Sequence, residues 1–301
     1  MLKTDDIRSG IMQYLPEDLK QEYLYYRKNH PDIEGLESPF INLSDAFRAY
    51  FILVDYFTDI STDDVREKMM VGIRSVDLLA SALGRQNITF GGKRKYTKPL
   101  DICATLFFGM VKNHSFNDGN KRCALLLLLY QLQLYGYNPT AQQKDFEKLV
   151  VSVAEGSLEK QYPLAYSKFK KSDDQIVLTL SYLLGRMTQK KNNAYHVDPT
   201  MKAFCSALEV HGVNYRVENG KVKFVYSTRG KWKVFNKDDR TFAIPFHGWT
   251  RTVGPRTARE TLDALGLYDQ FPTYQYMLDG SDALYKLVDK FKEPLRRLKD
   301  K

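Results

Sequence analysis

The sequence lacks the features that mark membrane and secreted proteins. Its longest apolar stretch, Cys123 to Leu134, is interrupted by Gln131 and Gln133. No segment reaches the roughly 18 to 20 uninterrupted apolar residues that a membrane helix needs. The first ten residues are polar and contain no apolar signal segment. We therefore expect a cytoplasmic protein that makes no contact with a membrane.

Cysteine and histidine are also scarce. The 301 residues include 3 cysteines and 5 histidines, and these form no CxxC, HExxH or HxxxH pattern. Cys103 and Cys123 lie in apolar, helix-like surroundings, where a reduced cysteine ordinarily serves packing. These observations argue against a zinc site.

Apolar residues make up 43% of the chain and aromatic residues 13%, which suffices for a buried core. The length is about twice that of a common single domain, so we expect one large or two moderate domains. The net charge of +9 favours anionic partners such as nucleotides, acidic proteins or nucleic acid, without choosing among them. The last segment, Lys286 to Lys301, holds seven basic and three acidic residues and is most simply explained as a solvated amphipathic helix.

Hydrophobic periodicity changes near residue 190. Before it, apolar residues recur at helical spacing, as in Val76, Leu79 and Leu83, so this part should be mainly helical. The exception is Asn87 to Tyr96, where β-branched and aromatic residues flank a Gly-Gly turn. This pattern predicts a short hairpin.

Residues 189–200 carry charge, asparagine and proline without apolar periodicity, which is typical of a surface connection. Beyond them, the Asn219-Gly220 turn and the alternation at Val222, Phe224 and Tyr226 predict a hairpin. The other elements expected in this region are helices at Met201 to His211, Thr257 to Leu265 and Ala283 to Leu298, and strands at Trp232 to Val234 and Phe242 to Phe246. The sequence thus predicts an N-terminal helical extension (1–40), a helical domain (41–190), a linker (191–200) and a small α+β domain (201–301).

One polar loop between two apolar helices concentrates the residues suited to chemistry. Leu100 to Lys112 is expected to form a helix, and Arg122 opens a second run that is apolar nearly all round until Gly136. The connection between them contains SFNDGNK, in which Asn, Asp and Gly favour a turn. Because a helix N-terminus has unpaired amides and a partial positive charge, the start of the second helix should bind anions.

Each residue of this loop can be explained either by a role in catalysis or by an ordinary structural role. Gly119 would let the backbone approach a phosphate, and Lys121 and Arg122 would add positive charge beside it. Asp118 could hold Mg²⁺ against the phosphates. His114 could take a proton from an attacking hydroxyl, because imidazole titrates near neutral pH. Singly, such residues usually form a helix cap, a turn or a charged surface, but together within nine residues they predict an active site.

The string from His114 to Arg122 is similar to the HxFx(D/E)GN(G/K)R signature of the Fic/Doc family and matches it at every fixed position. Gly72 to Leu83, followed by ITFGG, resembles the segment that leads to the flap hairpin of that family. The resemblance covers residues 40–190, approximately. It implies a mainly α fold, a Fic/Doc helical bundle with a short β-hairpin flap, followed here by the small α+β domain.

The resemblance also implies roles for the loop and the flap. His114 would act as general base on a Ser, Thr or Tyr hydroxyl of a target protein, Asp118 would bind Mg²⁺, and Phe116 would anchor the loop by packing. The flap would hold the target by strand addition, which needs only main-chain bonds. Its basic tip, Lys93 to Lys95, would either favour acidic targets or simply be solvated. The nucleotide phosphates would be cradled by Gly119, Asn120, Lys121 and Arg122, of which the last two also count as catalytic. The part of the flap that binds the target would comprise Ile88, Thr89, Phe90, Gly91 and Gly92.

Two positions bear on which group is transferred. Most of the family transfers AMP and has glycine at the position of Lys121 and a second arginine at the position of Leu125. The GNKR sequence instead resembles the Doc branch, in which ATP is thought to lie reversed and to give its γ-phosphate, so that the enzyme is a protein kinase. We favour phosphate transfer, with protein adenylyl transfer as the first alternative and a catalytically silent nucleotide- or RNA-binding module as the second.

Doc-like proteins are toxins of toxin–antitoxin pairs and are silenced by a partner that inserts a glutamate near the phosphates. The family's built-in inhibitory pattern, (S/T)xxxE(G/N), is not found. His30 to Gly35 has the glutamate and glycine but lacks the hydroxyl residue. An external inhibitor or antitoxin is therefore expected, or no inhibition.

The C-terminal domain resembles HicA-type RNA-binding toxins over Gly230 to Phe235 and Phe242 to Leu267. Trp232 stands where such toxins carry a catalytic histidine, so the resemblance implies RNA binding without cleavage, and His247 is expected to be structural. The alternative is an ordinary α+β accessory domain with a basic surface. The residues that would contact an RNA backbone are Lys231, Lys233, Arg251, Arg256 and Arg259.

Overall fold

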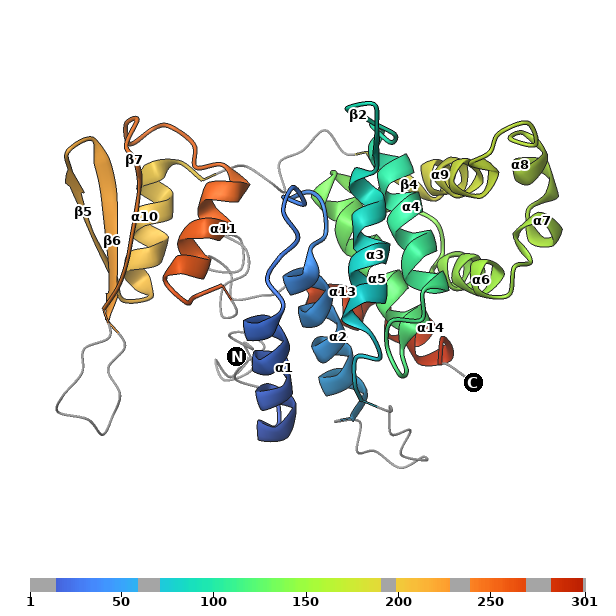
Figure 1. The fold of residues 1–301 in the computed structure, drawn as a ribbon, viewed down its shortest axis with the longest axis horizontal. Coiled ribbons are helices and arrows are strands. Elements are labelled where there is room, and N and C mark those ends of the chain that lie inside the picture. Colours follow the sequence, from blue (N-terminus) through green and yellow to red (C-terminus); the bar gives the residue numbers. More distant parts are fainter. Residues whose placement is uncertain (1–14, 59–70, 191–198, 228–238, 269–282, 300–301) are drawn as a thin grey trace, which may run out of the picture. The chain divides into compact units, whose positions relative to one another are not determined.

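The computed structural model describes residues 15–58, 71–190, 199–227, 239–268 and 283–299 (Figure 1). These residues form two compact units. The first, called the helical unit, contains 15–58, 71–190 and 284–299, and the second, called the α+β unit, contains 199–227, 239–268 and Ala283. The predicted fold class is confirmed, because the described elements are mostly helices with small antiparallel sheets.

The helical unit is organised around one central helix, α5, which is Asn120–Leu134. Its side chains from Cys123 to Leu129 are all fully buried. A helix that is apolar on every side must be surrounded by others, and α5 packs against α2, α4 and α6. The described helices of the unit are α1 (Glu17–Asn29), α2 (Leu43–Thr58), α3 (Val76–Gly84), α4 (Pro99–Lys112), α5, α6 (Gln143–Ala154), α7 (Leu158–Gln161), α8 (Pro163–Ser167), α9 (Gln175–Met187), α13 (Ala283–Lys290) and α14 (Lys292–Arg297), with a 3₁₀ turn at Arg85–Asn87.

Two short antiparallel strand pairs complete this unit. The predicted hairpin is present as β1 (Thr89–Phe90) and β2 (Lys93–Arg94). A second pair, β3 (Tyr137–Pro139) with β4 (Thr188–Lys190), joins the end of α5 to the end of α9 and was not predicted. Strands of three residues are too short to show an alternating pattern, which explains why the sequence does not reveal them.

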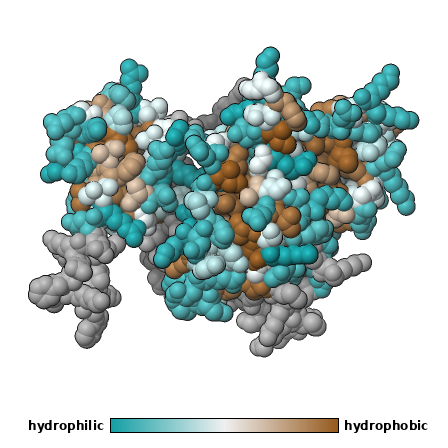
Figure 2. All heavy atoms as spheres, in the orientation of Figure 1, coloured by the Kyte–Doolittle hydropathy of each residue, from teal (hydrophilic) through white to brown (hydrophobic). Residues whose placement is uncertain are grey.

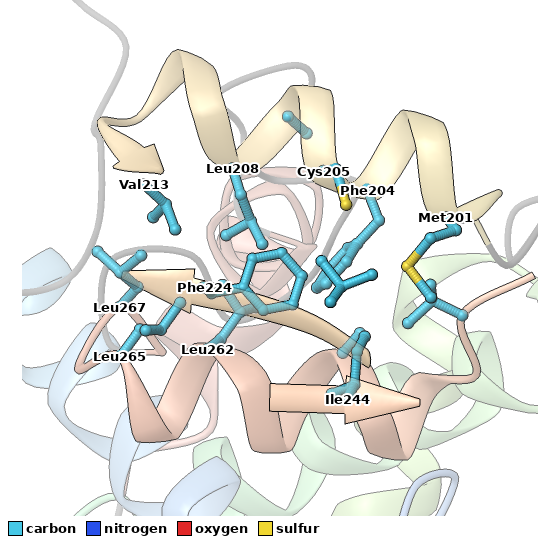
Figure 3. Packing of buried hydrophobic residues seen from close by; sticks show 14 of the residues in the cluster. Met201, Phe204, Cys205, Leu208, Val213, Phe224, Ile244, Leu262, Leu265 and Leu267 are labelled. Atoms are coloured by element: carbon cyan, nitrogen blue, oxygen red, sulfur yellow. The ribbon is translucent and has the colours of Figure 1, made fainter. Parts of the chain in front are cut away.

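The α+β unit has the order α10 (Met201–Val210), β5 (Val213–Glu218), β6 (Lys221–Ser227), β7 (Asp239–Pro245) and α11 (Pro255–Ala264). Its three strands form one antiparallel sheet, and the predicted turn has Asn219 at φ 49° and Gly220 at φ 70°, as a two-residue hairpin turn requires. Figure 3 shows Phe204 of α10, Phe224 of β6 and Leu262 of α11 in the same apolar core. The strand expected at Trp232 to Val234 lies outside the described residues.

The predicted domain boundaries need two corrections. Residues 284–299 belong to the helical unit and not to the small α+β domain, and residues 15–40 also join the helical unit, where Tyr23 of α1 packs on Phe51 of α2 with ring centres 5.4 Å apart. The apolar side chains of these segments are buried against the helical bundle. Periodicity shows that a segment has an apolar face, but it does not show which part of the chain covers that face. Of the predicted linker, residues 191–198 lie outside the described part of the chain.

The single helix predicted over Ala283 to Leu298 is two helices, α13 and α14, with Phe291 between them. Pro294 has no N–H to donate to the carbonyl of Lys290, so one helix cannot continue through this point. That carbonyl instead accepts a hydrogen bond of 2.5 Å from the Gln143 side chain of α6.

None of the helices in the described part of the chain combines the length and apolar character that crossing a membrane requires. On the face shown in Figure 2, hydrophilic residues cover most of the surface, with smaller hydrophobic areas between them. This mixture fits the charged fraction of 27% in the sequence.

Candidate active site

The loop that carries the family-like signature lies between α4 and α5, and we call residues 114–119 the motif loop. Helix α4 ends at Lys112, and His114 has φ 49°, a left-handed conformation that turns the chain out of the helix. Gly119, at φ 82°, is the N-cap of α5. The two left-handed residues therefore bracket a tight turn that ends at the positive end of the central helix.

The motif loop is closed from within by one side chain. Asn120 is buried, accepts a hydrogen bond from the Phe116 amide at 2.9 Å, and donates one to the Phe116 carbonyl at 2.8 Å. The predicted role of Phe116 as a packing anchor agrees with its geometry, since its ring is 1% exposed and stacks on Tyr50 at 4.2 Å. The carboxamide of Asn120 is thus engaged within the loop.

The motif loop is also held from outside by residues 72–75. The amides of Arg74 and Ser75 both donate to the Ser115 carbonyl, at 2.9 and 3.1 Å, and the Asn117 amide donates to the Gly72 carbonyl at 3.1 Å. The Tyr50 hydroxyl accepts from the Gly72 amide at 2.9 Å and donates to its carbonyl at 3.2 Å. Burial raises the pKa of Tyr50 far above its ordinary value, so the phenol keeps its proton and can donate. The sequence gives no sign of this brace.

His114 and Asp118 lie on the accessible side of the motif loop. The His114 side chain is exposed, and that of Asp118 is half-buried. One carboxylate oxygen of Asp118 accepts the Gly119 amide at 2.6 Å, and among the described residues the other oxygen has no hydrogen-bond donor. A half-buried carboxylate with one uncommitted oxygen has the hard donor that Mg²⁺ prefers, so the residue fits the predicted metal role.

Lys121 and Arg122 contact the C-terminal residues 295–299, which lie outside the predicted site. Arg122 is 2% exposed, and its guanidinium lies 4.6 Å from the centre of the Phe57 ring. Its Nε donates to the Leu295 carbonyl at 2.8 Å, and a terminal nitrogen donates to the Arg296 carbonyl at 3.5 Å. Lys121 donates to the Lys299 carbonyl at 2.8 Å. The helical spacing of the apolar residues in 284–298 indicates a face that must be buried, and this was the sequence feature that could have predicted a contact with another part of the chain.

The flap hairpin has the predicted Gly91-Gly92 turn, with both residues at positive φ. Phe90 is 69% exposed at its edge. Of the basic residues predicted at its tip, Lys95 follows β2 and so lies at the base of the hairpin, and both Arg94 and Lys95 contact other parts of the helical unit. Lys95 forms an ion pair of 2.6 Å with Asp174, and the guanidinium of Arg94 lies 5.2 Å from the Phe40 ring.

The residues expected to contact RNA differ in their surroundings, because two of them have partners within the α+β unit. Arg256 pairs with Glu260 at 2.9 Å, and the Arg259 guanidinium lies 4.9 Å from the Tyr268 ring. Arg251 is exposed. Lys231 and Lys233 lie outside the described residues.

With this geometry in place, comparison with known proteins gives one finding. Residues 40–132 match the model of the Fic/DOC family, a range that contains the flap, α4, the whole motif loop and all but the last two residues of α5. The match supports membership of this family and, in general terms, a Fic-type transferase. No curated protein and no solved structure matches the chain.

Proposed function

We propose that the chain transfers the γ-phosphate of ATP to a hydroxyl side chain of a target protein. The observation that carries this proposal is the motif loop together with the first turn of α5: His114 is exposed and Asp118 half-buried in the loop, and Lys121 stands at the start of the central helix. In this reading the target strand pairs with the edge of the flap hairpin.

The transfer requires one proton acceptor and one leaving group. His114 takes the proton of the target hydroxyl while its oxygen forms a bond to the γ-phosphorus. The bond from that phosphorus to the β–γ bridging oxygen breaks, and ADP leaves with the electron pair. Mg²⁺, held by Asp118, would neutralise charge on the phosphates. Lys121 would place a positive charge beside the transferred γ-phosphate. A glycine at this position would instead leave room for an α-phosphate, as AMP transfer requires.

The resemblance to the Doc branch adds a biological proposal. The activity would act as a toxin, and a separate inhibitor protein would silence it. Co-purification of the chain with a partner that blocks labelling in the assay below would support this role.

Two radiolabels separate the candidate reactions. The protein is incubated with Mg²⁺, a cell lysate and either γ-labelled or α-labelled ATP. Label from the γ-position on a protein supports phosphate transfer, and label from the α-position would replace it with AMP transfer. Absence of both labels would leave a binding module and overturn the proposal.

His114→Ala is the matched test of mechanism. We expect it to lower the labelling rate by about 10²- to 10⁴-fold, the usual contribution of a general base, with an unchanged circular dichroism spectrum. His247→Ala, which removes an exposed histidine of the α+β unit, should label normally. Undiminished labelling by His114→Ala would remove the imidazole from the mechanism.

A further inference from the structure

The C-terminal segment covers part of the candidate active site, and we call residues 284–299 the C-terminal cover. It packs on the rest of the helical unit through an apolar face, and the Phe291 ring meets that of Phe146 of α6 edge-on at 5.9 Å. The buried apolar residues of the cover are Leu284, Leu287, Val288, Phe291, Leu295 and Leu298.

The cover ends on the two cations of the motif. The carbonyls of Leu295 and Arg296, in the last turn of α14, accept from Arg122, and that of Lys299 accepts from Lys121. Carbonyls at the end of a helix carry a partial negative charge, so they satisfy cations in the manner of phosphate oxygens. Main-chain carbonyl oxygens of the cover therefore accept hydrogen bonds from the same two side chains, Lys121 and Arg122, that are expected to bind a nucleotide.

The same donors cannot serve both partners at once. A phosphate carries full negative charge and forms stronger hydrogen bonds with Lys and Arg than a neutral carbonyl does. We propose that the C-terminal cover competes with the phosphates of the nucleotide for Lys121 and Arg122, and that it holds the enzyme in a low-affinity state until it is displaced. This inference rests on the proposed function, because it assigns a control element to the same site.

The positive charges of the cover weaken its attachment beside Lys121 and Arg122. Its six basic side chains, against two acidic ones, give it a net charge of +4 beside two further cations. The ion pair of Arg297 with Glu147, at 2.8 Å, opposes this repulsion, but the two side chains are 50% and 21% exposed. A pair so exposed contributes little, so most of the attachment comes from the apolar face. This arrangement needs no glutamate of the (S/T)xxxE(G/N) pattern, since main-chain oxygens accept hydrogen bonds from both cations.

The first test uses the unaltered protein. Hydrogen exchange is measured with and without MgATP. We expect MgATP to speed exchange of the amides in residues 284–299 by at least about tenfold, because displacement breaks the helical hydrogen bonds of the cover. Unchanged or slowed exchange there, with MgATP bound at the motif loop, overturns the inference.

Two variants loosen the cover without touching the motif. Arg297→Ala should tighten MgATP binding, measured by calorimetry, by about two- to fivefold, the range for one exposed ion pair. Phe291→Ala removes the buried ring against Phe146 and should tighten it by about tenfold or more. Arg216→Ala breaks a comparable exposed pair with Glu218 in the α+β unit and should leave the affinity unchanged.

The outcomes separate the two proposals. Equal or weaker MgATP binding in Arg297→Ala and Phe291→Ala, with normal transfer of the γ-label, overturns the cover and leaves the proposed function intact. Should no variant bind MgATP or transfer label, both proposals fall. Arg297→Ala and the exchange measurement decide the question even if Phe291→Ala does not fold.

Discussion

Replacement of Asn120 by alanine tests whether the motif loop is held together by this one carboxamide. The change leaves the buried amide and carbonyl of Phe116 without their partners at 2.9 and 2.8 Å. An unsatisfied buried polar group costs about 1 to 3 kcal/mol, so the loss of two partners in Asn120→Ala should lower the free energy of unfolding of the helical unit by about 2 to 6 kcal/mol.

Two measurements address this prediction. Urea unfolding followed by circular dichroism gives the loss in free energy. Hydrogen exchange gives the local effect, since a loss of about 2 kcal/mol corresponds to roughly 30-fold faster exchange of the Phe116 amide. The matched control is Asn117→Ala, an exposed asparagine in the same loop, which should change stability by less than about 0.5 kcal/mol.

The reasoning is refuted if Asn120→Ala behaves like Asn117→Ala in both measurements. That result would mean that the stack of Phe116 on Tyr50 and the brace from residues 72–75 fix the motif loop without the carboxamide. A loss of transfer activity with unchanged stability would instead assign Asn120 a direct role at the nucleotide, as the sequence analysis expected.

Two further predictions concern stability. Tyr50→Phe keeps the stack on Phe116 but removes both hydrogen bonds to Gly72, so it should cost about 1 to 3 kcal/mol in urea unfolding, and a variant as stable as the parent would remove the hydroxyl from the brace. Burial raises the pKa of all three cysteines, that of Cys205 to about 11, so the folded chain keeps thiol protons that the unfolded chain releases above about pH 8.5. Above about pH 8.5 the unfolded state then binds fewer protons, so stability should fall from that pH upward, and for Cys205 the fall should continue to about pH 11. The fall should be smaller in a triple alanine variant; an equal fall in both proteins would contradict this cause.

Local features of the site were predictable because each has a local cause. The flap follows from a Gly-Gly turn between β-branched and aromatic residues, and the central position of α5 follows from an apolar run without a polar face. The match to the family model covers this same part of the chain.

The remaining features depend on contacts between distant residues. Arg122 and Leu295 are 173 positions apart, and periodicity predicts that residues 284–298 have an apolar face without saying what it covers. The brace of Gly72 on the motif loop consists mainly of main-chain bonds, which leave no mark on residue types. Asn120 was assigned to the nucleotide because its position in the signature is known, whereas its bonds to Phe116 appear only in three dimensions.

The anchoring of the flap affects how a target would be recognised. A two-stranded hairpin by itself is barely stable in water, but Lys95 and the Tyr96 hydroxyl both attach the base of this one to Asp174, at 2.6 and 3.2 Å. An incoming peptide would therefore meet an edge that is already in place, and the entropy lost on association would come mainly from the peptide. Severing this tether should weaken capture of every target alike, without altering which sequences are preferred.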